Sequence, residues 1–82
     1  MTQFIRSPKQ LGTLVHTARV DRDLTQQALA GLVGTGQKTI SRIENGYPGT
    51  KLDTVFRILA VLELDLTPAP RRKNSPDLAK IF

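Results

Sequence analysis

The sequence predicts an all-α domain of four helices, extended at its C-terminal side by one short β-strand. Three observations lead to this fold class. Apolar residues recur every three or four positions over four segments, as they do along the buried stripe of a helix. Residues that cap helices stand before these segments, and glycines follow two of them. Apolar and polar residues then alternate over 62–67 (LELDLT), a pattern typical of a half-buried strand.

The first helix is expected to begin after Ser7 and to end at about Val20. Ser7 is a suitable N-cap, Pro8 fits the first helical position, and Gln10 completes a capping box. We expect residues 1–6, which precede this helix, to form an N-terminal arm. The apolar stripe of the helix should consist of Leu11, Leu14, Val15 and Ala18.

The second helix is expected over about 26–33. Thr25 can cap its start, and Gly34 ends it, because glycine adopts the positive φ of a tight turn without steric cost. Ala30 supplies a small side chain where this helix and the next come closest. The apolar positions expected on its inner side are Ala28, Leu29, Leu32 and Val33.

The third helix is expected over about 37–45, with Ile40 and Ile43 as its inner anchors. Asn45 and Gly46 end it, since both residues accept the left-handed conformation of a C-cap. Two short helices joined by a glycine-containing turn form a helix-turn-helix unit, whose second helix enters the major groove of DNA. The sequence therefore predicts a DNA-binding domain.

The fourth helix is expected to start at Thr50, with Asp53 as its capping partner, and to run to about residue 62. Ile58 and Val61 widen its apolar stripe beyond one core face, which predicts a second buried surface such as a dimer contact. The residues expected on its main apolar face are Leu52, Val55, Phe56, Leu59 and Leu62.

The strand over 62–67 ends before Pro68 and Pro70. A single strand is not stable alone, so it needs a partner, either the segment 4–5 or its own copy in a second subunit. We expect the dimerisation residues to be Leu62, Leu64 and Leu66. The predicted organisation is an N-terminal arm (1–6), a helix-turn-helix domain (7–63), a dimerisation strand (64–69) and a basic flexible tail (70–82).

The outer face of the third helix carries side chains that can read base edges. Gln37 can form two hydrogen bonds, a bidentate pair, with adenine N6 and N7. Lys38 and Arg42 can donate to guanine O6 and N7 or to phosphate, and Ser41 can serve either a base or the backbone. These four residues share one helix face by their spacing, which favours sequence-specific binding to double-stranded DNA.

The charge balance agrees with a polyanionic partner. The chain has 82 residues, with 12 basic against 7 acidic side chains and a formal net charge of +5. Composition alone leaves nucleic acid, an anionic membrane and an acidic protein open. Gln26, at the start of the second helix, is expected to contact a phosphate, because helix N-termini bind anions. Lys51 is expected to make a further phosphate contact.

Several function classes are not favoured. The chain has no cysteine and one histidine, His16, so neither a thiolate site nor a histidine cluster is expected to hold a metal. We expect His16 to be a surface or half-buried helix residue. There is no phosphate loop, paired-carboxylate site or nucleophile, so we expect no enzyme activity, cofactor or small-molecule substrate. No signal peptide and no apolar run of about 20 residues is present, so a cytoplasmic location without a membrane partner is expected.

Four features allow more than one interpretation. Glu44 is expected to cap a helix or to pair with a basic group such as Arg57, rather than to contact DNA. Tyr47 could stack or touch a phosphate, or it could cover the core. The basic run 71–73 could be a solvated linker, a phosphate-binding extension or a partner-docking segment, and Phe82 could dock in a partner or fray.

The four predicted helices, the ENG ending of the third and the apolar fourth resemble the phage-repressor-like (Xre, lambda-repressor-like) helix-turn-helix family over about residues 7–62. The stretch GTGQKTISRIENG is similar to the recognition helix of that family. The resemblance implies a phosphate contact at Gln26. It also implies base or phosphate contacts at Gln37, Lys38, Thr39, Ser41 and Arg42.

A narrower resemblance is to the HipB-type antitoxins, through SPKQL, LTQ and LELDLT. It implies a homodimer that pairs a C-terminal strand, binds an inverted-repeat operator and represses its own operon. It also implies an antitoxin of a type II toxin-antitoxin system that restrains a HipA-like serine/threonine kinase. The tail matches no pattern of this subfamily, so the kinase-contacting residues are not assigned. A stand-alone Xre-type repressor, phage-like or metabolic, is the alternative, and a kinase reading frame next to the gene would distinguish the two.

Overall fold

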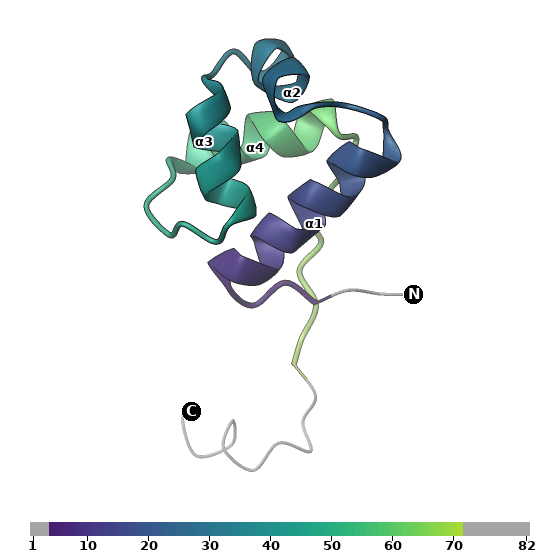
Figure 1. Cartoon of the computed structure of the whole chain (residues 1–82). Helices are drawn as coiled ribbons and strands as arrows, with labels where there is room; N and C mark the ends of the chain where they lie inside the picture. The colour runs from purple at the N-terminus through teal and green to yellow at the C-terminus, as the bar shows by residue number, and fades with distance from the viewer. Residues whose placement is uncertain (1–3, 72–82) are drawn as a thin grey trace.

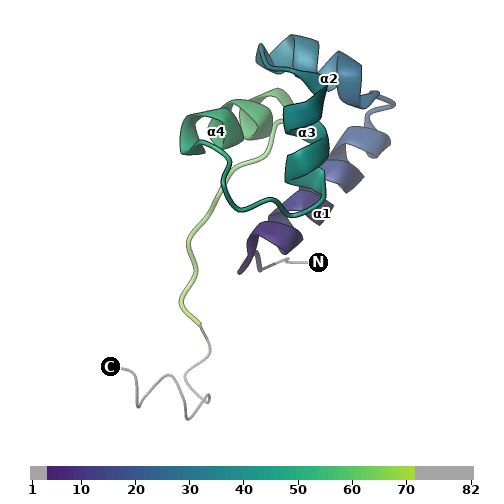
Figure 2. The same cartoon turned by 60° about the vertical axis from the view of Figure 1, so that its left-hand side comes forward.

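The computed structural model describes residues 4–71 as four helices joined by short loops (Figure 1). α3 packs against α1 and α2, and α2 also packs on α4. The chain after α4 leaves the bundle as an extended segment, which Figure 2 shows from a second direction. The all-α prediction is confirmed for this part of the chain. The helices are α1 (Pro8–Asp21), α2 (Gln26–Val33), α3 (Gln37–Glu44) and α4 (Leu52–Val61).

The first two helices begin at the predicted caps. Ser7 Oγ accepts a hydrogen bond from the backbone N–H of Gln10 at 3.1 Å, and Pro8 occupies the first turn of α1. Thr25 Oγ1 accepts from the backbone N–H of Ala28 at 2.9 Å. Each bond satisfies one of the N–H groups that have no partner in the first turn of a helix. Both bounds of α2 agree with the prediction, because both are set by local capping.

Gly34 makes the turn between α2 and α3. It has a φ of +85°, and its N–H donates to the carbonyl of Ala30 at 2.9 Å. Thr35 N donates to the same carbonyl at 3.0 Å, so the turn closes on the last part of α2. A side chain at Gly34 would be strained by this φ. The predicted glycine turn is therefore confirmed, and Ala30 is buried as expected.

α3 and α4 begin without a side-chain cap. Gly36 is the N-cap of α3 and Lys51 is the N-cap of α4, so the predicted cap at Thr50 is wrong. α3 ends at Glu44, and Gly46, with a φ of +88°, turns the chain away from it. The first N–H groups of both helices are thus left for water or for a ligand.

One apolar cluster connects all four helices. The predicted inner residues of α1, α2 and α3 that lie in it are Val15, Ala18, Leu29, Val33, Ile40 and Ile43. Leu11 and Leu24 are partly buried against the cluster. Ile58 and Leu62 join it from the C-terminal half of α4 and the residue that follows it, and both are almost completely buried.

Four residues expected inside are exposed instead. Leu52 is 69% exposed, Phe56 50% and Leu32 62%, and Ala28 is exposed as well. α4 is apolar on most sides, so its periodicity does not select the face that meets the core. The buried face of the helix consists of Thr54, Ile58 and Leu59.

The backbones of α1 and α3 come very close at Gly12, a contact that sequence reasoning missed. A Cβ added at Gly12 would lie 2.3 Å from the carbonyl oxygen of Ile43 and 2.8 Å from that of Glu44. Both neighbours are backbone atoms, which cannot rotate away as a side chain can. Gly12 therefore sets the distance between α1 and α3.

The segment expected to form the dimerisation strand is not a strand in the described chain. Leu62 is 0% exposed inside the core and follows α4 directly, so it offers no surface to a second subunit. Glu63 has a φ of +56°, which redirects the chain, and Leu64 packs partly against the core. Leu66 is 48% exposed. A strand requires hydrogen bonds from a neighbouring strand, and the described residues of one copy place none beside it.

Candidate nucleic-acid interface

The outer face of α3 is polar and basic. Ile40 and Ile43 are buried on its inner side, whereas Gln37, Lys38 and Arg42 are exposed on its outer side. The four-residue spacing aligns positions 38 and 42 along one line of the helix surface. The edges of this face are formed by two half-buried hydroxyl residues, Thr39 and Ser41.

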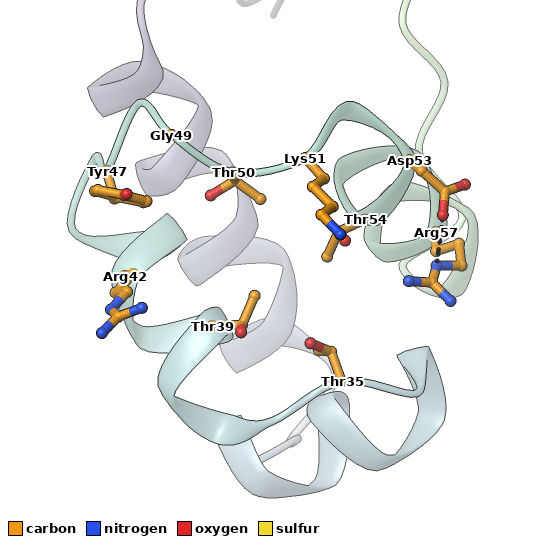
Figure 3. A pocket seen from close by; sticks show the side chains of 10 residues that line it. All are labelled: Thr35, Thr39, Arg42, Tyr47, Gly49, Thr50, Lys51, Asp53, Thr54 and Arg57. Atoms are coloured by element: carbon orange, nitrogen blue, oxygen red, sulfur yellow. Dashed lines mark ion pairs between the residues drawn. The ribbon is translucent and has the colours of Figure 1, made fainter.

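A polar hollow lies beside this face, between α3, the loop that follows it and the first turns of α4 (Figure 3). Arg42, Lys51 and Arg57 give it three positive charges and Asp53 gives it one negative charge. Arg57 Nε lies 3.6 Å from Asp53 Oδ2, the ion pair drawn as a dashed line. The positive surplus suits a polyanion. The rest of the lining is Thr35, Thr39, Tyr47, Gly49, Thr50 and Thr54.

Three of the predicted DNA-binding residues meet at this hollow, namely Thr39, Arg42 and Lys51. Two others meet at the start of α3, where Gln37 Nε2 donates to Gln26 Oε1 at 3.4 Å. The first side chain of α2 thus reaches the first side chain of α3, the helix expected to enter the major groove. Lys38 and Ser41 lie on α3 outside the lining of the hollow.

Glu44 ties α3 to α1 beneath this face. Its side chain is 4% exposed, and it accepts hydrogen bonds from Arg19 Nε at 2.7 Å and from Arg19 Nη2 at 3.1 Å. His16 Nδ1 lies 2.9 Å from Glu44 Oε1, on a ring that is half exposed at the surface. Arg19 also donates to the carbonyl of Leu24 at 2.6 Å. The predicted structural role of Glu44 agrees with this geometry, but Arg57 as its example partner is wrong.

Glu44 also reaches the interface. Gln26 Nε2 donates to Glu44 Oε1 at 3.1 Å, which turns Gln26 Oε1 toward the amide of Gln37. The buried carboxylate of Glu44 therefore orients Gln26, and Gln26 in turn contacts Gln37 on the exposed face of α3.

The ionisation of Glu44 follows from these contacts. Burial alone would raise the pKa of the carboxyl group, but the hydrogen bonds from Arg19, His16 and Gln26 outweigh burial and hold the pKa below its ordinary value. The hydrogen bond to Glu44 likewise raises the pKa of Arg19 despite its burial. The pair is thus charged at neutral pH.

The structure also bears on the predictions about membrane spans, metal sites and the two ends of the chain. Among residues 4–71, no helix is both long and apolar enough to cross a bilayer, and no three histidine, aspartate or glutamate side chains are grouped to hold a metal ion. Arg71 is exposed at the end of the described chain. The rest of the basic tail and Phe82, like residues 1–3 of the arm, lie outside the described residues.

Comparison with known proteins places this geometry in a family. Residues 15–68 match the family described as helix-turn-helix. Antitoxin HipB of Escherichia coli (strain K12) is 40% identical over 75 residues, which span 92% of this chain and 85% of HipB. Antitoxin HipB of Escherichia coli O6:H1 is 40% identical over 78 residues, spanning 95% of this chain and 83% of that protein. The chain belongs to the HipB-type helix-turn-helix family.

Solved structures of this family share the fold. The chain matches the HipA-HipB-O2-O3 complex with a TM-score of 0.80 and 39% identity, over 87% of this chain and 100% of that chain. It matches the HipB-O4 20mer complex with a TM-score of 0.79 and 39% identity, again over 87% of this chain and 100% of that chain. The helix-turn-helix arrangement of α2 and α3 is thus that of HipB-type proteins.

Proposed function

We propose that this HipB-type chain is a sequence-specific DNA-binding repressor that also serves as the antitoxin of a type II toxin-antitoxin operon. The observation that carries this proposal is the exposed polar and basic face of α3, next to a hollow with three positive charges. The similarity to HipB in the HipA-HipB-O2-O3 and HipB-O4 20mer complexes supports it. The protein carries out no catalysis in this role.

α3 reads the major groove. Gln37 pairs with an adenine, while Lys38 and Arg42 donate to guanine or to phosphate. Gln26 and Lys51 contact the phosphate backbone on either side, at the starts of α2 and α4, where helix N-termini favour anions. The remaining contacts come from Thr39 and Ser41. In a dimer with a two-fold axis the two copies of α3 occupy successive major grooves, roughly 34 Å apart, so the operator is an inverted repeat.

Replacing Gln37 or Arg42 by alanine should weaken specific binding by about 1–3 kcal/mol each, because Gln37→Ala loses a base contact and Arg42→Ala loses a contact to a base or to a phosphate. Gel shifts on a duplex from the region upstream of the chain's own gene will measure the loss. A scrambled duplex of equal length is the control: Gln37→Ala should bind it as weakly as the unmodified protein does, whereas Arg42→Ala, which also loses a positive charge, should bind it more weakly still. Unchanged affinity for the upstream duplex in both variants would contradict the assignment of α3 as the reading helix.

The dimer forms through the segment around Leu64 and Leu66, which pairs as a strand with its copy in the second subunit. The alternating pattern of this segment and the exposure of Leu66 support this arrangement. Leu66→Asp should turn the dimer into a monomer in sedimentation equilibrium, since a charge at a strand-strand contact loses its hydration. Leu32→Asp is the matched control, because Leu32 is also an exposed leucine (62% against 48% for Leu66) but lies on α2. A dimer that survives Leu66→Asp would rule out this interface.

The second partner is a HipA-like serine/threonine kinase, which the antitoxin binds and restrains. Affinity purification of the native protein, with identification of both DNA and protein in the eluate, will test this proposal. A HipA-like kinase together with upstream DNA is the expected result. Upstream DNA without a kinase would instead show a stand-alone repressor of the Xre type.

A further inference from the structure

Arg42 is stacked on an aromatic ring before any DNA is bound. Its guanidinium carbon lies 5.9 Å from the centre of the Tyr47 ring, within the range of a cation–π contact. Tyr47 N donates to the carbonyl of Arg42 at 2.9 Å, so the backbone also places the two side chains together. Figure 3 shows both at one edge of the polar hollow. The stack is thus part of the candidate interface.

Gly49 leaves room for the ring of Tyr47 because it has no side chain. A Cβ at Gly49 would lie 2.6 Å from Tyr47 Oη and 2.7 Å from Tyr47 Cζ. The φ of Gly49 is not in the left-handed region, so its backbone conformation suits any residue. A Cβ at this position would therefore displace the tyrosine ring, and glycine leaves the ring where it is.

Tyr47 also borders the apolar side of the molecule, where it lines a second hollow together with Leu11 and Ile43. The residue is 50% exposed, so it covers the core only in part. Its ring also lies close to Gly49 and to the guanidinium of Arg42. Stacking was one of the roles that the sequence suggested for Tyr47, and its stacking partner in the structure is Arg42 of α3.

We propose that Tyr47 is a positioning residue that holds the guanidinium of Arg42 in a DNA-reading orientation, with Gly49 making room for the ring. This proposal rests on the proposed function, in which Arg42 contacts DNA. A free arginine side chain loses rotamer freedom when it binds. Stacking removes part of that freedom in advance and leaves the N–H groups at the edge of the guanidinium available for a guanine or a phosphate.

Gel shifts on the upstream duplex test the role of the ring. Tyr47→Ala should weaken binding by about two- to fivefold, the effect of an exposed cation–π contact, and Tyr47→Phe should restore binding because the ring remains. In an Arg42→Ala background, Tyr47→Ala should have no further effect. Equal losses in Tyr47→Phe and Tyr47→Ala would overturn the proposal, since they would assign the effect to the hydroxyl group.

Gly49→Ala offers an independent test that leaves Tyr47 in place. The added methyl group should push the ring off Arg42 and weaken binding as much as Tyr47→Ala does. In a Tyr47→Ala background the same substitution should change nothing. A loss that persists without the ring would contradict the proposal, because it would mean that the methyl group itself obstructs DNA.

NMR of the protein without DNA detects the contact between Arg42 and Tyr47 independently of its effect on DNA binding. The δ-protons of Arg42 should show an upfield ring-current shift, which Tyr47→Ala and Gly49→Ala remove. Additive effects of Tyr47→Ala and Arg42→Ala on operator binding, or no ring-current shift, would overturn the role given to Tyr47 alone. Failure of the unmodified protein to bind the upstream duplex would instead refute the proposed function.

Discussion

Replacing Gly12 by alanine is expected to lower the free energy of unfolding by about 2 kcal/mol. The added Cβ would lie 2.3 Å from the carbonyl oxygen of Ile43, so α1 and α3 must move apart. Overpacking of this severity costs about 3 kcal/mol, and the better helix propensity of alanine returns about 1 kcal/mol. Urea unfolding followed by circular dichroism will measure the difference.

Gly31→Ala is the matched control for this substitution. Gly31 also lies within a helix, but no atom comes within 4 Å of a Cβ added there. At Gly31 only the better helix propensity of alanine acts, so this variant should be more stable than the unmodified protein by up to about 1 kcal/mol. The same chemical change should thus have opposite signs at the two glycines. Equal stabilisation at both positions would show that α1 and α3 tolerate a wider separation.

Features fixed by neighbours in the sequence could be predicted. Thr25 and Gly34 bound α2 where expected, because a cap and a left-handed glycine act on the adjacent backbone. The outer face of α3 followed from the helical period, which places Gln37 and Arg42 opposite Ile40. These predictions needed no knowledge of the tertiary fold.

Features fixed by distant residues could not be predicted. Gly12 carries no local sign that its backbone touches α3, apart from being a glycine inside a helix. Arg19 lies 25 residues from Glu44 and is one of many basic residues that could have paired with it. At the interface, the stack of Tyr47 on Arg42 depends on how the loop after α3 folds back.

The C-terminal half also shows where periodicity fails. α4 has apolar residues on most of its sides, so the pattern did not identify the buried ones, and Phe56 was placed inside although it is exposed. The alternating segment 62–67 has the pattern of a strand, but Leu62 is buried in the core of its own subunit. A strand needs a neighbouring strand to pair with, and residues 4–71 of one copy do not supply one.

Replacing Glu44 by glutamine is expected to lower the free energy of unfolding at neutral pH by about 2 kcal/mol, because removal of one member of a partly buried ion pair leaves the other charge without its partner. Arg19 is the residue left unpaired, with its side chain 11% exposed. Glutamine keeps the shape of glutamate, so the loss reports charge and hydrogen bonding rather than a cavity. Asp53→Asn is the control, since the pair of Asp53 with Arg57 is exposed and should contribute about 0–1 kcal/mol.

The pH dependence of this loss tests its electrostatic origin. The folded-state pKa of Glu44 is lowered, so its contribution to stability is complete above the ordinary carboxyl value of 4.5 and disappears as the pH falls through the folded-state pKa. The stability difference between the unmodified protein and Glu44→Gln should therefore shrink as the pH falls below the ordinary carboxyl value. Urea unfolding of both proteins across this range will measure the difference. A difference that stays constant well below the ordinary carboxyl pKa would show that the loss arises from altered packing, and that the charge of Glu44 does not hold α3 against α1.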